Sequence, residues 1–361
     1  MRKLTALLTA IILMVTFSGA VYAVPVYTQN SIRVYDNSEY DFTVTEQDGD
    51  NNTIVRIYER PKNTSAAAMS ITPLNTTFDQ DNRARTTELL SALGMDDAFI
   101  AKLSDEDLQG YAQSSQIVSA ISYTKTDENG NVTNVTAEEA ENAAELYSVT
   151  LPPHVKDDGT TGGTGDGATF IDSYMEITVV VAYWGSARYR FTIDAEWLTD
   201  PFYTLTDSIG ICAQDMAVQN GTRSGWYSFT EVETVSNVST SNSNTVNLSH
   251  FYTVTNGSWE GSAATVDLKS TYIHNPEMGD DRTTYTDHLV HFQFDALVRQ
   301  DEEALNFNVV GTYEHSKVYI WPDVSIGISS TGGAVSIGFD LITSKDTRNV
   351  EFDNSFRYVP D

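Results

Sequence analysis

The second half of the chain alternates apolar and polar residues. From about residue 169 to the C-terminus, apolar side chains recur at every second position in most segments. This period is typical of strands that bury one face of an antiparallel sheet, and two such faces packed together form a sandwich. The clearest series are Ala187, Tyr189, Phe191, Ile193, Ala195 and Trp197; Val290, Phe292, Phe294, Ala296 and Val298; and Leu305, Phe307, Val309, Gly311 and Tyr313. We therefore predict an antiparallel β-sandwich domain over residues 169–361. Its polar positions, such as Arg188, Arg190, Asp194 and Glu196, are expected to face water.

The first half of the chain changes character more often. Short alternating stretches predict strands at residues 31–35, 40–45 and 53–59. Helix signals follow, with N-caps expected at Asp96, Ser104 and Thr136 and a left-handed stop at Gly94. Residues 24–156 are therefore predicted to form a small α+β region with short helices.

A Gly/Thr-rich segment separates these two regions. Residues 157–167 contain only Asp, Gly and Thr, so residues 157–168 are predicted to be a linker or long loop. Within it, Gly163, Gly165 and Ala168 match the spacing of a dinucleotide-binding fingerprint. That fingerprint needs a strand before it and a helix after it, and the pattern here offers neither. We expect no cofactor.

The N-terminus has the pattern of a cleaved export signal. Arg2 and Lys3 precede an uncharged run over residues 4–17, and small residues end at Ala23. The alternative is an uncleaved anchor helix, but the apolar run is short for a span of about 20 residues. We predict a signal peptide over residues 1–23, cleavage after Ala23, and a secreted chain without a transmembrane segment.

Charge and cysteine content narrow the classes of partner. The chain carries 21 Lys+Arg against 50 Asp+Glu, for a net charge of −29, which disfavours binding to DNA, RNA or anionic lipid. Its single cysteine, Cys212, lies in an apolar run and cannot form an internal disulfide. A long exported chain without disulfides suggests a bacterial source, and Cys212 is expected to be buried and inert.

Six short segments carry a resemblance to known proteins. They are Leu89-Leu-Ser-Ala-Leu-Gly-Met95, Leu103-Ser-Asp-Glu-Asp-Leu108, Ser122-Tyr-Thr-Lys-Thr-Asp-Glu-Asn-Gly-Asn131, Ala195-Glu-Trp-Leu-Thr-Asp-Pro-Phe202, Asp207-Ser-Ile-Gly210 and Arg223-Ser-Gly-Trp-Tyr227. Together they resemble uncharacterised exported proteins of Gram-positive, clostridia-like bacteria, and the resemblance extends over about half of the chain. The resemblance implies export and brings no activity, ligand or catalytic residue.

Motifs for hydrolysis and metal binding are weak. The sequence contains no Gly-x-Ser-x-Gly, His-Glu-x-x-His or Walker-type run. His288 and His291 are three residues apart on a strand, so they point to opposite faces; the first is expected in the core edge and the second in solvent. Turns at Asp48 and Asp127 only partly match a calcium loop, because Thr53 and Val132 replace its glycine. We predict no metal site.

A carboxylate pair is the remaining catalytic possibility. A glycosidase needs two acids that converge across a cleft. Asp194, Glu196, Asp200, Asp207 and Glu260 are available for such a pair.

Aromatic residues beside probable loops offer a binding surface. The pair Trp226-Tyr227 follows Gly225, and Trp259 follows Gly257-Ser258. Flat rings on loops can stack on the faces of neutral sugars. The alternative is ordinary packing in the core or at strand ends. The Ser/Thr-rich residues 230–255 predict an exposed polar hairpin, since their apolar positions are too few for a membrane-inserting one.

The sequence thus predicts an exported protein that binds without catalysis. Its partner would be a glycan, a component of the cell envelope or another protein. The alternative is a secreted hydrolase, glycosidase-like, that uses a carboxylate pair.

Overall fold

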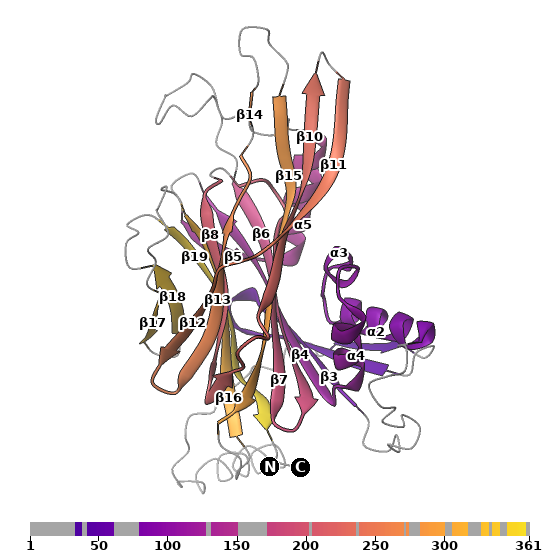
Figure 1. The fold of residues 1–361 in the computed structure, drawn as a ribbon. Coiled ribbons are helices and arrows are strands. Elements are labelled where there is room, and N and C mark those ends of the chain that lie inside the picture. The colour runs from indigo at the N-terminus through magenta and orange to yellow at the C-terminus, as the bar shows by residue number, and fades with distance from the viewer. Residues whose placement is uncertain are drawn as a thin grey trace, which may run out of the picture. The chain divides into compact units, whose positions relative to one another are not determined.

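The computed structural model of the 361-residue chain divides into two units, Met1–Ser31 and Ile32–Asp361. Figure 1 shows the fold. It describes residues 33–37, 42–60, 79–127, 131–150, 172–201, 204–235, 238–270, 272–273, 282–299, 305–316, 326–331, 334–339 and 345–358. The expected export signal and the cleavage after Ala23 lie outside the described residues and stay predictions.

Two antiparallel sheets face each other in the second unit, which confirms the predicted mainly-β sandwich. Within the described residues, the larger sheet has the order β1-β2-β3-β4-β6-β7-β15-β10-β11, with β5 beside β4 and with β9 and β14 beside β15. Its strands are β1 (Arg33–Asn37), β2 (Phe42–Asp48), β3 (Ile54–Glu59), β4 (Gln116–Thr126), β5 (Val132–Val135), β6 (Ser173–Gly185), β7 (Arg188–Trp197), β9 (Met216–Val218), β10 (Ser224–Val235), β11 (Val238–Asn247), β14 (Tyr272–Ile273) and β15 (Arg282–Val298).

The second sheet has the order β12-β13-β8-β16-β19, and a separate hairpin pairs β17 with β18. These strands are β8 (Thr206–Gln214), β12 (Phe251–Asn256), β13 (Trp259–Asp267), β16 (Leu305–Ser316), β17 (Ile326–Thr331), β18 (Ala334–Phe339) and β19 (Lys345–Tyr358).

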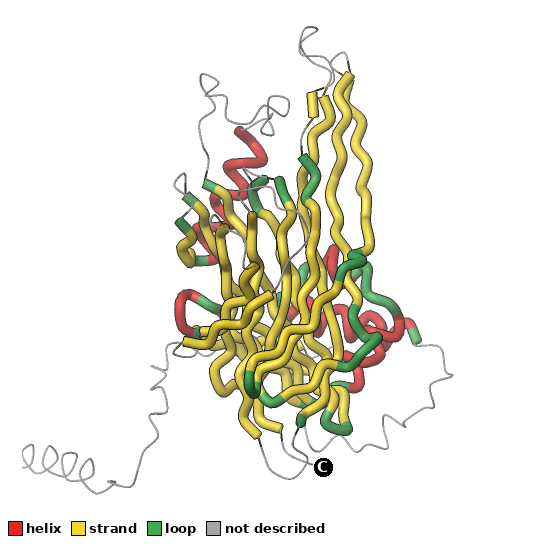
Figure 2. The backbone as a smooth tube through the Cα atoms, turned by 60° about the vertical axis from the view of Figure 1, so that its left-hand side comes forward, coloured by secondary structure: helices red, strands yellow, loops and turns green. Residues whose placement is uncertain are grey.

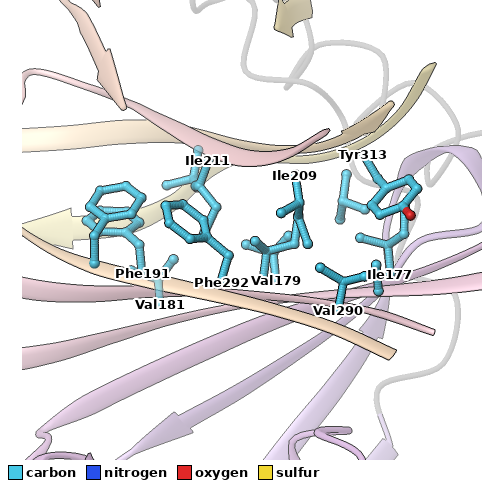
Figure 3. Packing of buried hydrophobic residues seen from close by; sticks show 14 of the residues in the cluster. Ile177, Val179, Val181, Phe191, Ile209, Ile211, Val290, Phe292 and Tyr313 are labelled. Carbon is cyan, nitrogen blue, oxygen red and sulfur yellow. The ribbon is translucent and has the colours of Figure 1, made fainter. Parts of the chain in front are cut away.

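The main core lies between the two sheets, and it is built by the predicted alternation. Val179, Phe191 and Phe292 of the larger sheet pack toward Ile209 and Ile211 of the smaller one (Figure 3). The sheets approach closely at Gly311, where a Cβ atom would lie 2.3 Å from a methyl carbon of Val179. Glycine is therefore required at that strand position for steric reasons. Cys212 is also buried, as predicted, and burial raises the pKa of its thiol to about 12.

Local capping signals place the helices as expected. The helices are η1 (Asp50–Asn52), α2 (Gln80–Ala92), α3 (Asp97–Ile100), α4 (Asp105–Gln113) and α5 (Ala137–Thr150). Gly94 adopts a φ of 87° after α2, Asp96 caps α3, and Ser104 forms a reciprocal capping box with Asp107. Among the described helices, none is long and apolar enough to cross a bilayer.

Helices α2 to α4 cover the outer face of the larger sheet, which corrects the expectation that its polar positions face water (Figure 1). Leu89, Leu108 and Tyr111 from the helices join Val180 and Ala182 of β6 in a second buried cluster. As a result, Asp194 is 2% exposed and Arg190 is 8% exposed. Alternation identified the inner face correctly, but it carried no signal that helices would bury the outer one.

Strands from both sides of the predicted linker form one continuous sheet. Strand β4 pairs with β6 from Ile117 opposite Ala182 to Thr126 opposite Ser173. The linker itself, residues 157–168, lies outside the described residues. The division into regions 24–156 and 169–361 therefore stays a prediction, although these regions share the larger sheet.

Candidate functional site: the buried polar face and the free sheet edge

Trp226 lies on β10 beneath helix α3. Its ring stacks on His291, with centroids 5.2 Å apart, and contacts Phe99 at 5.3 Å. The ammonium of Lys102 lies 4.2 Å from the ring centroid, and partial burial lowers the pKa of that lysine. Trp226 is therefore a half-buried ring that helps to hold α3 against the sheet.

Tyr227 points to the opposite face of the same strand. It is 2% exposed, and its hydroxyl lies 2.6 Å from Nδ1 of His288 and accepts a 3.0 Å hydrogen bond from the backbone N–H of Lys269. Burial raises the pKa of Tyr227 and lowers the pKa of His288 to about 4. His288 is thus the satisfied core-edge histidine that was predicted, and Tyr227 is a core residue.

Trp259 belongs to the other sheet. It lies on β13 opposite Asn256 and Gln214, and it is half buried. The three predicted aromatic residues therefore occupy two sheets and both faces of β10, and they do not form one exposed surface.

We expect Trp226→Ala to lower the free energy of unfolding by about 2 kcal/mol, below the 3–5 kcal/mol typical of a fully buried ring because this ring is only half buried. Chemical denaturation measures the change. Tyr252→Ala, at another half-buried aromatic residue that joins none of the core clusters, is the control and should cost less. An unchanged midpoint for Trp226→Ala would show that the ring does not anchor α3.

Two carboxyls lie side by side on the outer face of the larger sheet. Glu176 of β6 is directly opposite Glu196 of β7 in the strand register. Burial, followed by the charges of Asp96 and Glu176, raises the pKa of Glu196 to about 8. Burial also raises the pKa of Glu176, although Thr178 and Tyr123 donate hydrogen bonds to it. This pair is able to hold a proton at neutral pH.

The other carboxylates proposed for a catalytic pair serve structure. Asp207 accepts hydrogen bonds from the Tyr313 hydroxyl at 2.5 Å and the Ser316 N–H at 3.1 Å. Asp200 accepts from Tyr147, and burial raises the pKa of Asp200 to about 6. Glu260 pairs with Arg299. Of the five predicted acids, only Glu196 has another acid directly across from it, and that partner, Glu176, was not predicted.

A second polar cluster lies under α3 and α4. His291 Nδ1 is 2.6 Å from Asp194 Oδ1, and burial raises the pKa of Asp194 despite that histidine. Arg190 bonds to Asp295 and, at 2.6 Å, to Asp107 of α4. His291 is 2% exposed, so its predicted solvent position is wrong, for the same reason as the rest of this face.

The turns that partly matched a calcium loop have other uses. Asp127 accepts hydrogen bonds from both the backbone and the side chain of Asn131, and Asn51 accepts one from Asn134. In the part of the chain that the structure describes, no group of three or more His, Cys, Asp or Glu could hold a metal ion.

Strand β11 forms one edge of the larger sheet and, together with β10 and the start of β15, extends past the neighbouring strands (Figures 1 and 2). All of its residues are exposed except the partly exposed Asn244. Val235 of β10 and Val238 and Val246 of β11 are 44%, 66% and 49% exposed and share one face. The Ser/Thr-rich segment is exposed as predicted, but its bounds differ, because Asn242 lies in the middle of β11 and residues 251–255 belong to β12 of the other sheet.

This edge lacks the features that usually protect an edge strand. Between Val238 and Asn247 there is no proline and no charged residue, and the pairing of β10 with β11 has no bulge. A long, uncharged edge strand without a bulge offers unpaired backbone N–H and C=O groups to another strand. The sequence suggested a hairpin, but the position of β11 at the edge depends on long-range strand pairing.

Comparison with protein-family models gives no match, and comparison with curated proteins gives none either.

Proposed function

We propose that the protein is exported and binds another protein by strand addition at the edge of β11, without catalysing a reaction. The observation that carries this proposal is the ten-residue uncharged edge strand that extends past its neighbours. In strand addition, the backbone of an extended segment supplies affinity, and alternate side chains supply specificity. Export is supported by the leader pattern that ends at Ala23.

A protein partner fits this molecule better than a glycan. Sugar binding through the predicted rings needs an exposed aromatic surface, whereas Tyr227 is buried and Trp226 packs under α3. The β11 edge instead presents hydroxyl and amide side chains, with exposed valines near both of its ends. Side chains of these kinds can pair with the side chains of a neighbouring strand.

Site-specific photo-crosslinking tests the proposal on the chain expressed with its own leader. A photoreactive phenylalanine analogue at Ser241 of β11 should give an adduct with a second polypeptide in culture supernatant. The analogue at Asn142, which is exposed on α5, should give none. Adding Ser243→Lys should remove the Ser241 adduct, because a lysine blocks edge pairing.

The same sample also tests export, since its intact mass should correspond to a chain that starts at Val24. Adducts of equal yield at both positions, or an adduct that persists in Ser243→Lys, would contradict binding at this edge.

A hydrolase that uses a carboxylate pair is the second candidate. It is favoured by Glu196, whose raised pKa would leave a proton available for general acid catalysis, beside Glu176. It also requires room for a substrate at both carboxyls.

A further inference from the structure

The sequence of β11 is nearly symmetric about Asn242. Reading outward from Asn242, Ser241 matches Ser243, Thr240 corresponds to Asn244, Ser239 to Thr245 and Val238 to Val246. When two copies of a strand pair antiparallel about a two-fold axis, residues equally distant from the axis lie opposite each other. Pairing about Asn242 therefore places like residues together across nine positions.

This register also covers the exposed valines. Val238 of one copy would lie opposite Val246 of the other, on the face that already carries Val235 beside Val238. Each end of the paired strands then holds a cluster of three valines. In a single copy of the chain, these valines are exposed to water. If the register shifted by one residue, Val238 would lie opposite Asn247, and the pairing of Val238 with Val246 would be lost.

Charge favours a meeting of two copies at this edge. The chain has a net charge of −29, so two copies repel over most of their surfaces, but residues 234–259 contain no Asp, Glu, Lys or Arg. The nearest acid across the sheet is Glu231, opposite Asn242, and it accepts a 3.1 Å hydrogen bond from Asn244. Across three strand spacings, from β10 through the two paired β11 strands to the other β10, the two copies of Glu231 would be about 14 Å apart, beyond the screening length of about 8 Å at physiological salt.

We propose that the protein bound at this edge is a second copy of the chain, joined by antiparallel pairing of β11 with β11 about Asn242. The proposal rests on the proposed function and names its partner. The pairing continues the larger sheet of one copy into that of the other. Because one strand pair is small beside the roughly 1,200–2,000 Å² of a stable complex, the dimer is reversible and dissociates on dilution.

A single cysteine on β11 tests the register in the purified mature protein. Asn242→Cys places two thiols on the two-fold axis, with Cα atoms about 4.5–5.5 Å apart, within the range for a disulfide. Thr240→Cys is the matched control, because its two copies would be offset by about 13 Å along the strands. Mild oxidation should give a disulfide dimer for Asn242→Cys and none for Thr240→Cys, and the native Cys212 is buried.

Charge replacement at the same position is a second, independent test. Asn242→Lys and Asn242→Glu should each raise the dissociation constant about tenfold or more at low salt, because like charges meet on the axis. An equimolar mixture of the two variants should form heterodimers. Sedimentation velocity measures each equilibrium over a range of concentrations.

The outcomes separate this inference from the proposed function. Equal disulfide formation by both cysteine variants would overturn the register, and a monomer at all concentrations would overturn self-pairing. If the monomer still gives the Ser241-specific photo-adduct with a different protein, strand addition stands and only the identity of the partner is wrong. If the protein forms neither the dimer nor the Ser241-specific photo-adduct, the proposed function is overturned as well.

Discussion

Replacing Arg190 with Met should lower the free energy of unfolding by about 3–5 kcal/mol, the usual cost of removing one partner from a buried ion pair. The guanidinium is 8% exposed, bonds to Asp295 of β15 and Asp107 of α4, and lies 4.1 Å from the ring centroid of Trp184. Without it, the buried Asp295 keeps only the more distant and more exposed Arg188 as a cationic partner. Burial would raise the pKa of Asp107, but the hydrogen bond from Ser104 and the charge of Arg190 outweigh burial and lower it.

Arg188→Met is the matched control. Arg188 lies two residues before Arg190 on β7, so both side chains are on the same face of the sheet. The Arg188 guanidinium is 3.9 Å from Asp295, and the Arg188 side chain is more exposed than that of Arg190. Because the Arg188 side chain is 44% exposed, water screens its pair with Asp295, which should contribute about 0–1 kcal/mol. Adding Asp295→Asn to Arg190→Met should recover part of the loss, since it removes the stranded charge. Equal effects of Arg188→Met and Arg190→Met in urea denaturation would contradict a role for Arg190 in docking α4.

Local patterns predicted the sandwich and the helix ends well. Every second residue from Tyr189 to Trp197 faces the core because a strand has a period of two. The stop at Gly94 and the cap at Ser104 depend only on neighbouring residues, so they are readable in one sequence. These features need no information about distant parts of the chain.

The candidate sites depend on the register of strand pairs and on contacts between distant residues, and sequence predicted them poorly. Glu176 meets Glu196 because β6 pairs with β7 in one register, and His291 is buried because α3, almost two hundred residues earlier, lies over it. One error was avoidable. Trp226 and Tyr227 are consecutive residues of a strand, so the period of two already places their rings on opposite faces.

Glu196 should contribute a loss of stability as the pH rises from 5 to 8. Its pKa is about 8 in the folded state, against an ordinary value of 4.5, chiefly because the carboxyl is buried and then because Asp96 and Glu176 lie nearby. The folded protein therefore keeps a proton that the unfolded chain releases above pH 4.5. The stability linked to this proton is fully present below that pH and is lost as the pH rises through 8, at about 1.4 kcal/mol per pH unit.

Glu196→Gln should remove much of this slope, because an amide stays neutral at every pH. Urea denaturation at pH 5 should give the variant and the parent similar stabilities, whereas at pH 9 the variant should be more stable by a few kcal/mol. A smaller slope should remain, since burial also raises the pKa values of Glu176 and Asp194. Glu138→Gln, at an exposed position of α5, should leave the slope unchanged. Parallel curves for the parent and Glu196→Gln would mean that the carboxyl is ionised in the folded protein at neutral pH, and the hydrolase candidate would then lose its general acid.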